Sequence, residues 1–283
     1  MNPTVAVIAP GAMGAAVGAR LVQRGARVIT SLAGRSTASA ERAAAAGMVP
    51  VSDAEIVAAD FVLSIVPPKE ALPLAERLAP SLSAANEKPV YVDCNAVSPE
   101  TAGRIADVIA ATGCPFVDGG IIGGPPRASY NGPIVYVSGA EAKRTEELNQ
   151  FGLLFRIMDG PIGAASAIKM CYGGITKGLT AVGSAMALAA HRAGVADALH
   201  AELAASQPAI LGRLTGSVPD MFSKAYRWVA EMEEIASFLG ERSEADMFRG
   251  IAELYQRLAI DMQGSKDEID ALAEFFAKAR DQR

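Results

Sequence analysis

The sequence predicts a doubly wound α/β sheet followed by an all-α C-terminal region, with a long helix joining the two. Up to about residue 160, short apolar runs alternate with helical stretches, which is the pattern of a largely parallel sheet covered by helices. Beyond Gly160, Pro161 and Gly163, a cluster of helix-breaking residues, only helical stretches follow. We therefore expect an α/β domain at residues 1–160 and a helical domain at residues 161–283.

The composition limits the classes of function. The chain has 283 residues, of which 51% are hydrophobic and 20% charged, as in a globular protein of one or two domains. Its formal net charge of −5 argues against general nucleic-acid binding. The three cysteines form no CxxC pair, and the two histidines cannot make a histidine-rich metal site. We expect a cytoplasmic protein without a metal, a signal peptide or a membrane span.

The individual elements follow from runs of apolar residues and the breakers between them. We expect strands at 4–9, 26–30, 61–66, 90–93, 116–118, 134–138 and 155–158. The first helix is expected from the glycine turn to about 24, and the second from Ser36 or Thr37 to 46. Further helices are expected at 72–78, from the segment after Pro99 to about 112, and from Gly160 to about 191. The segment 119–126 is expected as a loop, and 194–195, 215–219 and 263–265 as turns between C-terminal helices.

A glycine turn follows the first strand directly. Gly11, Ala12, Met13 and Gly14 lie between that strand and a helix, which is the context that makes a glycine motif a dinucleotide-binding hypothesis. Gly11 would let the backbone approach the pyrophosphate, Gly14 would allow close packing of the helix, and the helix N-terminus would face the phosphates. The first glycine of GxGxxG is replaced by Ala9, and an ordinary tight turn is the alternative.

The end of the second strand indicates which dinucleotide is bound. NAD sites usually place an acid there for the ribose 2′-hydroxyl, and residues 31–37 contain none. Ser31, Arg35, Ser36 and Thr37 instead offer a cation and hydroxyls suited to a 2′-phosphate, so the expected cofactor is NADP(H). Ser36 or Thr37 could also cap the following helix, which is compatible with phosphate binding.

Other candidate residues follow the later strands, at the sheet edge where ligands of such folds bind. Val66 and Pro67 end the third strand run, and Asn95 follows the fourth. Arg127 and Tyr130 could contact a ligand, or they could be exposed loop residues.

Two lysines stand out in the long apolar helix. Lys169, Gly173 and Lys177 are spaced by four residues and share one face. Burial lowers the pKa of a lysine and makes it usable as an acid or base, so Lys169 is a candidate catalytic residue. The alternative is a pair of surface lysines that extend to solvent.

Together these segments resemble the β-hydroxyacid dehydrogenase superfamily, which includes 6-phosphogluconate and 3-hydroxyisobutyrate dehydrogenases. The resemblance covers about residues 5–190 and is carried by the segments 11–14, 64–67, 93–99, 119–124 and 163–169. It implies a Rossmann-type domain followed by an all-helical domain, joined by a long helix. Members of the family are usually dimers or larger, and their helical domains help form the partner's site, so we expect a homodimer through the helical domain. The resemblance assigns the catalytic proton transfer to Lys169, and it places Asn95, Val66 and Pro67 near the cofactor. The stretch 224–236 resembles a poorly characterised branch of the superfamily.

The departures from the family concern the substrate. Ile122 stands where a serine usually precedes the pair Gly123 and Gly124, and Gly173 stands where an asparagine usually follows the lysine. Thr176 replaces a glutamate of 6-phosphogluconate dehydrogenase, and Glu233–Glu234 replaces a common Lys-Asp pair. The expected substrate residues are Ile122, Gly123, Gly124, Tyr172, Gly173 and Lys177. We expect a bulkier or less polar substrate than the small hydroxy acids; helix packing is the rival explanation for Gly173 and Gly174.

Three functional hypotheses remain. The leading one is an NADP-dependent oxidoreductase that acts on a hydroxy or keto compound with Lys169 as acid and base. The second is an imine reductase of the same architecture, although such relatives usually lack the lysine. The third is a cofactor-binding sensor that has lost catalysis.

Overall fold

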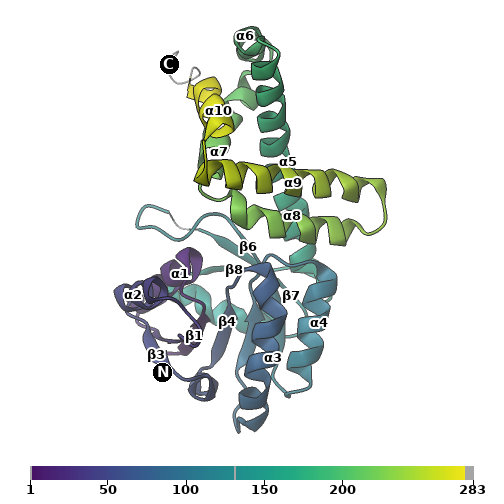
Figure 1. Ribbon diagram of the computed structural model, residues 1–283. Helices are drawn as coiled ribbons and strands as arrows, with labels where there is room; N and C mark the ends of the chain where they lie inside the picture. Colours follow the sequence, from purple (N-terminus) through teal and green to yellow (C-terminus); the bar gives the residue numbers. More distant parts are fainter. Residues whose placement is uncertain (1, 131, 278–283) are drawn as a thin grey trace. The chain divides into compact units, whose positions relative to one another are not determined.

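The computed structural model describes residues 2–130 and 132–277. The chain forms two compact units, Met1–Met170 and Cys171–Arg283, and both contain part of the long helix α5 (Ala164–Arg192). Figure 1 shows the order of the elements within each unit. The expected change from α/β to all-helical structure is confirmed.

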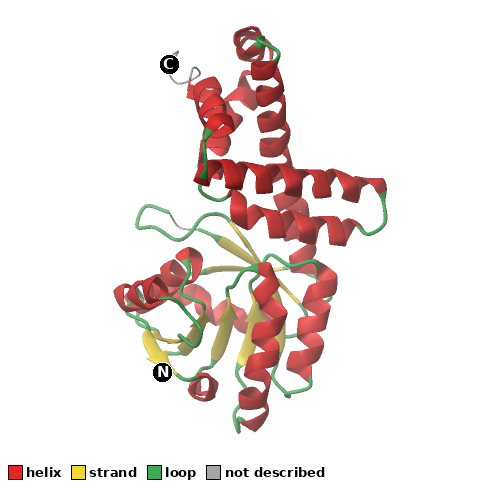
Figure 2. Cartoon of the chain, viewed as in Figure 1, coloured by secondary structure: helices red, strands yellow, loops and turns green. Residues whose placement is uncertain are grey.

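The first unit is built on one sheet whose order is β3-β2-β1-β4-β5-β6-β7-β8 in the part of the chain that is described. Neighbouring strands are parallel except for the antiparallel pair β6 and β7. Figure 2 shows the strands and the helices around them. The strands are β1 (Thr4–Ile8), β2 (Arg27–Ser31), β3 (Val49–Val51), β4 (Phe61–Ser64), β5 (Val90–Asp93), β6 (Phe116–Ile122), β7 (Ile134–Ser138) and β8 (Leu154–Ile157).

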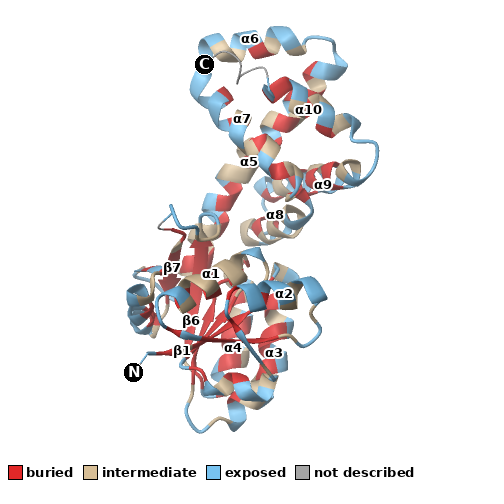
Figure 3. Ribbon diagram, turned by 90° about the vertical axis from the view of Figure 1, so that its left-hand side faces the viewer, coloured by how far each residue is buried: buried red, intermediate tan, exposed pale blue. Residues whose placement is uncertain are grey.

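Helices cover both faces of this sheet, because each has an apolar side. Val17 and Leu21 of α1 (Ala12–Gln23) pack in one core, whereas Leu78 of α3 (Pro68–Ala84) and Ile105 of α4 (Pro99–Ala110) pack in the other. Figure 3 shows the central strands buried and the outer helix faces exposed. The remaining elements of this unit are α2 (Thr37–Ala45) and the 3₁₀ helices η1 (Asp53–Ala58) and η2 (Ala142–Phe151). The predicted doubly wound fold is confirmed.

Two sequence predictions about elements of this unit were wrong, and two short elements were not expected. The helix expected at 72–78 extends over Pro68–Ala84 and contains Pro73 and Pro80. Its buried positions recur at helical spacing, and their burial outweighs the hydrogen bonds that proline removes. The strand β3 and the helix η1 were not expected at all, because they are short. The segment expected as a loop from residue 119 begins instead as strand, since β6 runs on to Ile122.

The second unit contains the rest of α5 and a set of shorter helices. These are α6 (Ala196–Ser206), α7 (Pro208–Phe222), α8 (Ala225–Leu239), α9 (Ser243–Gln263) and α10 (Asp267–Ala277). Helices α8 and α9 lie side by side and are joined at Gly240, whose φ is 74°. The turn expected at 215–219 is wrong, because α7 continues through it. Leu214, Val218 and Met221 are buried along α7, and this burial outweighs the unfavourable glycine and proline.

Strand β6 and the start of α5 lie in direct backbone contact. A Cβ atom at Gly120 would stand 2.6 Å from the carbonyl oxygen of Ala165 and 3.0 Å from Cβ of Lys169. Glycine at this strand position therefore sets how closely the helix approaches the sheet.

Gly120→Ala should lower the free energy of unfolding by about 1–3 kcal/mol, because the added methyl group meets a backbone atom that cannot turn aside. The matched control is Gly103→Ala in α4, where the new Cβ meets no heavy atom within 4 Å. This control should stabilise the helix by up to about 1 kcal/mol. Urea denaturation measures both, and equal stability of the two variants would contradict the contact.

Candidate active site

The glycine turn has the geometry that a dinucleotide site needs. A Cβ at Gly14 would collide with the carbonyl oxygen of Ala9, so only glycine fits where α1 leaves β1. Gly11 is the N-cap of α1 without a side-chain hydrogen bond, and a Cβ there would meet nothing within 4 Å. The turn thus leaves open space in front of a helix N-terminus, where Ala12 and Met13 begin the helix.

The loop after β2 is held by the expected cap residue Ser36 and by Arg42, which was not among the expected site residues. Ser36 caps α2, and its hydroxyl accepts from the backbone N–H of Ser39 at 3.3 Å, as expected for a cap. Arg42 donates from Nε to the carbonyl of Pro10 at 2.9 Å and from Nη2 to Oγ of Ser39 at 2.9 Å. Arg42 therefore ties the glycine turn to the start of α2. Arg35 is half-buried on the same loop.

Asn95 orders the loops that follow β4 and β5. Its Oδ1 accepts from the backbone N–H of Val66 at 2.6 Å, and its Nδ2 donates to Oγ of Ser64 at 2.8 Å and to Asp93. The side chain is buried, so its amide is engaged within the protein and fixes Val66 and the exposed Pro67 behind it. A direct contact of Asn95, Val66 or Pro67 with a cofactor stays a prediction.

Asp93 is an acid buried at the end of β5. Burial, and next the charge of Asp118 on the neighbouring strand, raise the pKa of the Asp93 carboxyl to about 7. Hydrogen bonds from Asn95 oppose this rise, but Oδ2 of Asp93 has no hydrogen-bond partner among the described residues. The carboxyl is therefore easily protonated near neutral pH.

Asp118 fastens the start of α5 to β6. Its Oδ2 accepts from the backbone N–H groups of Gly163, Ala165 and Ser166 at 2.9, 2.9 and 3.0 Å. Hydroxyl groups complete the set, since Ser138 donates to Oδ2 at 3.0 Å and Ser166 to Oδ1 at 2.6 Å. An anion at a helix N-terminus is favourable, and here it fixes where the helix begins. Asp118 was not among the expected site residues, because only the fold brings it to residues 163–166.

Lys169 lies one turn into α5 and is held against β6. Its Nζ donates to the carbonyl of Ile121 at 2.5 Å, and the side chain is half-buried. Ile122, half-buried at the strand's last position, follows this carbonyl directly. The lysine thus does not extend freely into solvent, and the sheet orients its amine at the carboxyl end of β6.

The loop after β6 is attached to α1. Arg20 of α1 donates from Nη2 to the carbonyls of Arg127 and Tyr130 at 2.8 and 3.1 Å. Gly123 and Gly124 are exposed at the start of this loop, as are Arg127 and Tyr130 farther along. The expectation of exposed loop residues agrees with this placement, and their contact with a ligand stays a prediction.

The later residues of α5 that were expected to bind substrate lie in the helical unit. Lys177 forms an ion pair with Glu231, and its Nζ lies 5.2 Å from the centre of the Trp228 ring. Tyr255 donates to the backbone carbonyl of Lys177 at 2.6 Å. The charge of Lys177 is therefore already balanced inside the unit. Tyr172 is exposed.

The two neighbouring glycines of α5 have different surroundings. A Cβ at Gly174 would stand 3.2 Å from Phe248, so helix packing accounts for this glycine. At Gly173 the nearest atom, Cδ1 of Ile235, is 3.8 Å away, which is an ordinary contact. Packing therefore does not explain Gly173.

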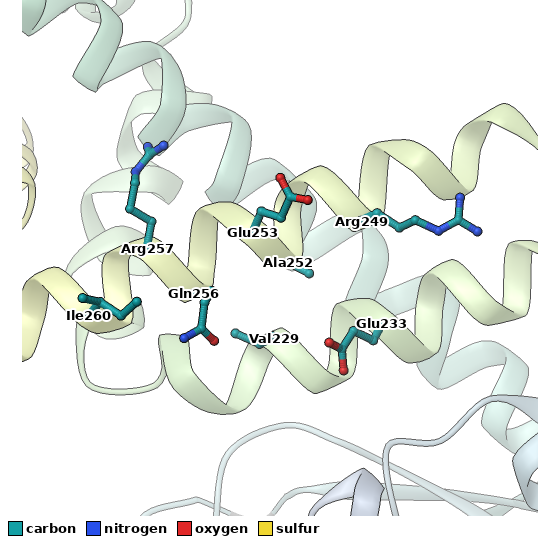
Figure 4. Close-up of a pocket in the computed structure, with 8 residues that line it drawn as sticks. All are labelled: Val229, Glu233, Arg249, Ala252, Glu253, Gln256, Arg257 and Ile260. Carbon is teal, nitrogen blue, oxygen red and sulfur yellow. The ribbon is translucent and has the colours of Figure 1, made fainter.

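A separate groove of about 510 Å³ runs between α8 and α9. Figure 4 shows Val229 and Glu233 on α8 and the other lining residues on α9, where the side chain of Gln256 points toward α8. None of the residues expected to bind cofactor lines it.

Among the described residues, no group of His, Cys, Asp and Glu side chains could hold a metal ion. None of the described helices has the length and apolar character needed to cross a membrane.

The fold and the glycine turn define a dinucleotide-binding protein of the doubly wound class. The chain belongs to the family of the NAD binding domain of 6-phosphogluconate dehydrogenase, which matches residues 4–153. Residues 190–258 match a domain of unknown function, DUF1932. The resemblance to the β-hydroxyacid dehydrogenases, in a branch with a divergent C-terminal domain, is confirmed. A nicotinamide dinucleotide as cofactor is supported by the NAD binding domain of this family.

Two individual proteins are similar to this chain in sequence. An uncharacterized 28.5 kDa protein of Methanothermus fervidus is 32% identical over 140 residues, which are 50% of this chain and 51% of that protein. The match thus spans about half the length of this curated relative. A solved conserved protein of unknown function, described as structurally similar to 3-hydroxyacid dehydrogenases, is 29% identical, with a TM-score of 0.69 over 95% of this chain and 99% of that one.

More distant structures share the fold. The 3-hydroxyisobutyrate dehydrogenase of Mycobacterium tuberculosis, solved with L-serine, is 20% identical, with a TM-score of 0.70 over 100% of both chains. An imine reductase of Myxococcus stipitatus, solved with NADP+, is 17% identical, with a TM-score of 0.57 over 97% of this chain and 99% of that one. At these identities the likeness shows the architecture and does not choose between the two reactions.

Asp93→Asn should remove a pH-dependent loss of stability. The pKa of Asp93 rises from its ordinary 3.8 to about 7 in the folded protein. The contribution of the Asp93 carboxyl to the free energy of unfolding is therefore full below about pH 4 and is lost as pH rises through about 7. Thermal unfolding at pH 5 and pH 8 measures this. The unfolding temperature of the wild type, relative to that of the variant, should be higher at pH 5 than at pH 8. The same difference at both pH values would contradict the raised pKa of Asp93.

Proposed function

We propose that the protein is an NADP-dependent dehydrogenase or reductase in which Lys169 exchanges a proton with the substrate oxygen. The observation that carries the proposal is the amine of Lys169, held at 2.5 Å from the carbonyl of Ile121 at the carboxyl end of β6. Ligands of open α/β sheets bind beyond these strand ends, so an oriented amine lies at the edge where substrate is expected.

The residues of this chain supply binding, orientation and proton transfer. A bound nicotinamide supplies or accepts the hydride. As hydride reaches a carbonyl carbon, negative charge develops on its oxygen, and an ammonium group can donate a proton there. In the oxidation direction the neutral amine of Lys169 takes the proton back. The Ile121 carbonyl and the Asp118 attachment of α5 hold the amine in one place, which is the positioning that such catalysis needs.

The proposed cofactor is NADP(H). The loop after β2 carries Arg35, and the cap residue Ser36 begins the helix beside it. Arg42 adds a second cation at the start of α2 through its bond to Ser39. A guanidinium and helix N–H groups are the partners that a 2′-phosphate prefers.

The proposed substrate is a hydroxy or keto compound less polar than the small hydroxy acids. Ile122 places an apolar side chain at the end of β6 where a hydroxyl group was expected from the family. A Cβ atom at Gly173 would make only an ordinary contact with Ile235, so helix packing does not require glycine at this position. The apolar Ile122 also keeps a C=N substrate as the second candidate. The free thiols Cys94, Cys114 and Cys171 support a reducing compartment, so we place the protein in the cytoplasm.

Replacement of Lys169 tests the proton-transfer role. Panels of ketones, hydroxy compounds and cyclic imines, followed through NADPH absorbance, first identify a convertible compound. Lys169→Met should then reduce turnover by about 10²-fold or more with little change in NADPH affinity, because it removes the acid but keeps the aliphatic stem. The control Lys143→Met changes an exposed lysine of η2 and should keep full turnover. Equal turnover in Lys169→Met would contradict the role, and conversion of imines alone would favour the second candidate.

We further propose a homodimer in which α5 packs against its counterpart in a second copy. Ile175, Val182 and Met186 are 74%, 55% and 56% exposed, and the seven- and four-residue spacings place them on one face of α5. Tyr172 belongs to the same face and is also exposed. Contiguous exposed apolar side chains on a helix are typical of a protein–protein interface.

Charge on this face should prevent assembly. Light scattering at micromolar concentration should give the wild type twice the chain mass of 29.3 kDa. The double variant Ile175→Glu, Met186→Glu should give a single chain, because the pair of buried charges would be costly at the interface. Val49→Glu, on the exposed strand β3, is the control and should remain a dimer. A wild-type mass of one chain would refute the homodimer.

A further inference from the structure

The loop after β2 contains no acidic residue, but an acidic residue that follows β3 lies beside the end of β2. Strand β3 is parallel to β2 with Val51 opposite Ser31, so the residues after β3 lie beside the end of β2. Asp53, the first residue of η1, accepts from Oγ of Ser31 at 2.5 Å. In doubly wound folds, the end of β2 is where an acid meets the ribose that carries the 2′ position. The fold therefore brings a carboxylate to a place that the sequence left without one.

An arginine from a third element opposes this carboxylate. Nε of Arg77, in α3, lies 3.4 Å from Oδ2 of Asp53, and Nη1 of Arg77 donates to the carbonyl of Ala33 at 3.3 Å. The guanidinium thus spans from Asp53 to the loop between β2 and α2. The Arg77 and Asp53 side chains remain 35% and 25% exposed, so a ligand from solvent can reach both.

The two charges favour different forms of a dinucleotide. A carboxylate accepts a hydrogen bond from a 2′-hydroxyl and repels a 2′-phosphate, whereas a guanidinium attracts the phosphate. Arg77 favours a 2′-phosphate in two ways: its own charge attracts the phosphate, and its pairing with Asp53 offsets the repulsion by the carboxylate. The relative strength of the two charges then sets the affinity for the 2′-phosphate form of the dinucleotide relative to the 2′-hydroxyl form.

We propose that Asp53 and Arg77 set the cofactor preference, with Arg77 favouring NADP(H) and Asp53 favouring NAD(H). This inference rests on the proposed nicotinamide dinucleotide, but not on which of the two forms the wild type prefers. The rival role is structural, in which the pair only fastens η1 and α3 to β2. A structural role weakens the binding of both cofactors alike, so the ratio of their dissociation constants separates the two roles.

The test measures dissociation constants for NADPH and NADH with the full-length chain by titration calorimetry. Arg77→Met keeps the aliphatic stem and removes the charge, and it should lower the preference for NADPH by about fivefold, a size suited to a partly exposed pair. Asp53→Asn keeps the shape and the hydrogen bond from Ser31, and it should raise the preference by a similar factor.

A matched control makes the same change elsewhere. Arg144 of η2 pairs with Glu141 at 3.7 Å, and Arg144→Met should leave the ratio unchanged. An unchanged ratio in both Asp53→Asn and Arg77→Met overturns the inference, and if Arg77→Met does not fold, Asp53→Asn decides alone. A wild type that prefers NADH refutes the proposed NADP(H) preference, while opposite shifts in the variants still support the pair. A wild type that binds neither cofactor overturns both proposals.

Discussion

The bonds between Asp118 and the first residues of α5 are the interaction on which the rest of the site depends. A carboxylate buried in a sheet loses its hydration, and this cost is offset only when enough donors replace the water. Three backbone N–H groups at the helix start and the hydroxyls of Ser138 and Ser166 do so here. The helix start is thereby fixed to β6. Lys169, four residues after Ala165, then comes to rest on the Ile121 carbonyl.

The same carboxylate affects its neighbour on the sheet. Asp93 and Asp118 are paired in register on β5 and β6, so their charges lie close together in a dry environment. Asp118 receives the donors of α5, and the pKa of Asp93 rises to about 7. The ordering of Asn95 and Val66 therefore involves an acid that is easily protonated near neutral pH. One structural attachment thus influences two of the loops at the strand ends.

The sequence was sufficient where the signal is local, and insufficient where residues meet only through the fold. The glycine turn, the strand pattern and the face shared by Lys169, Gly173 and Lys177 are periodic or contiguous features, and the fold class follows from them. Asp53 and Ser31 are 22 residues apart, and Asp118 and Ser166 are 48 apart, so no local pattern relates them. The prolines in α3 and α7 misled the helix boundaries for a different reason, because burial of an apolar face outweighed local propensity.

The contact at Gly120 also bears on how such a chain can change over generations. The strand and the helix start are separated by more than forty residues in the chain, yet an atom added to one meets the backbone of the other. A substitution there survives only if the helix shifts, and a shifted helix would carry the lysine away from its carbonyl. Drift in the two segments is therefore coupled, whereas the exposed faces of the surrounding helices can diverge independently. Distant descendants would then keep this junction long after most of their remaining sequence had ceased to match.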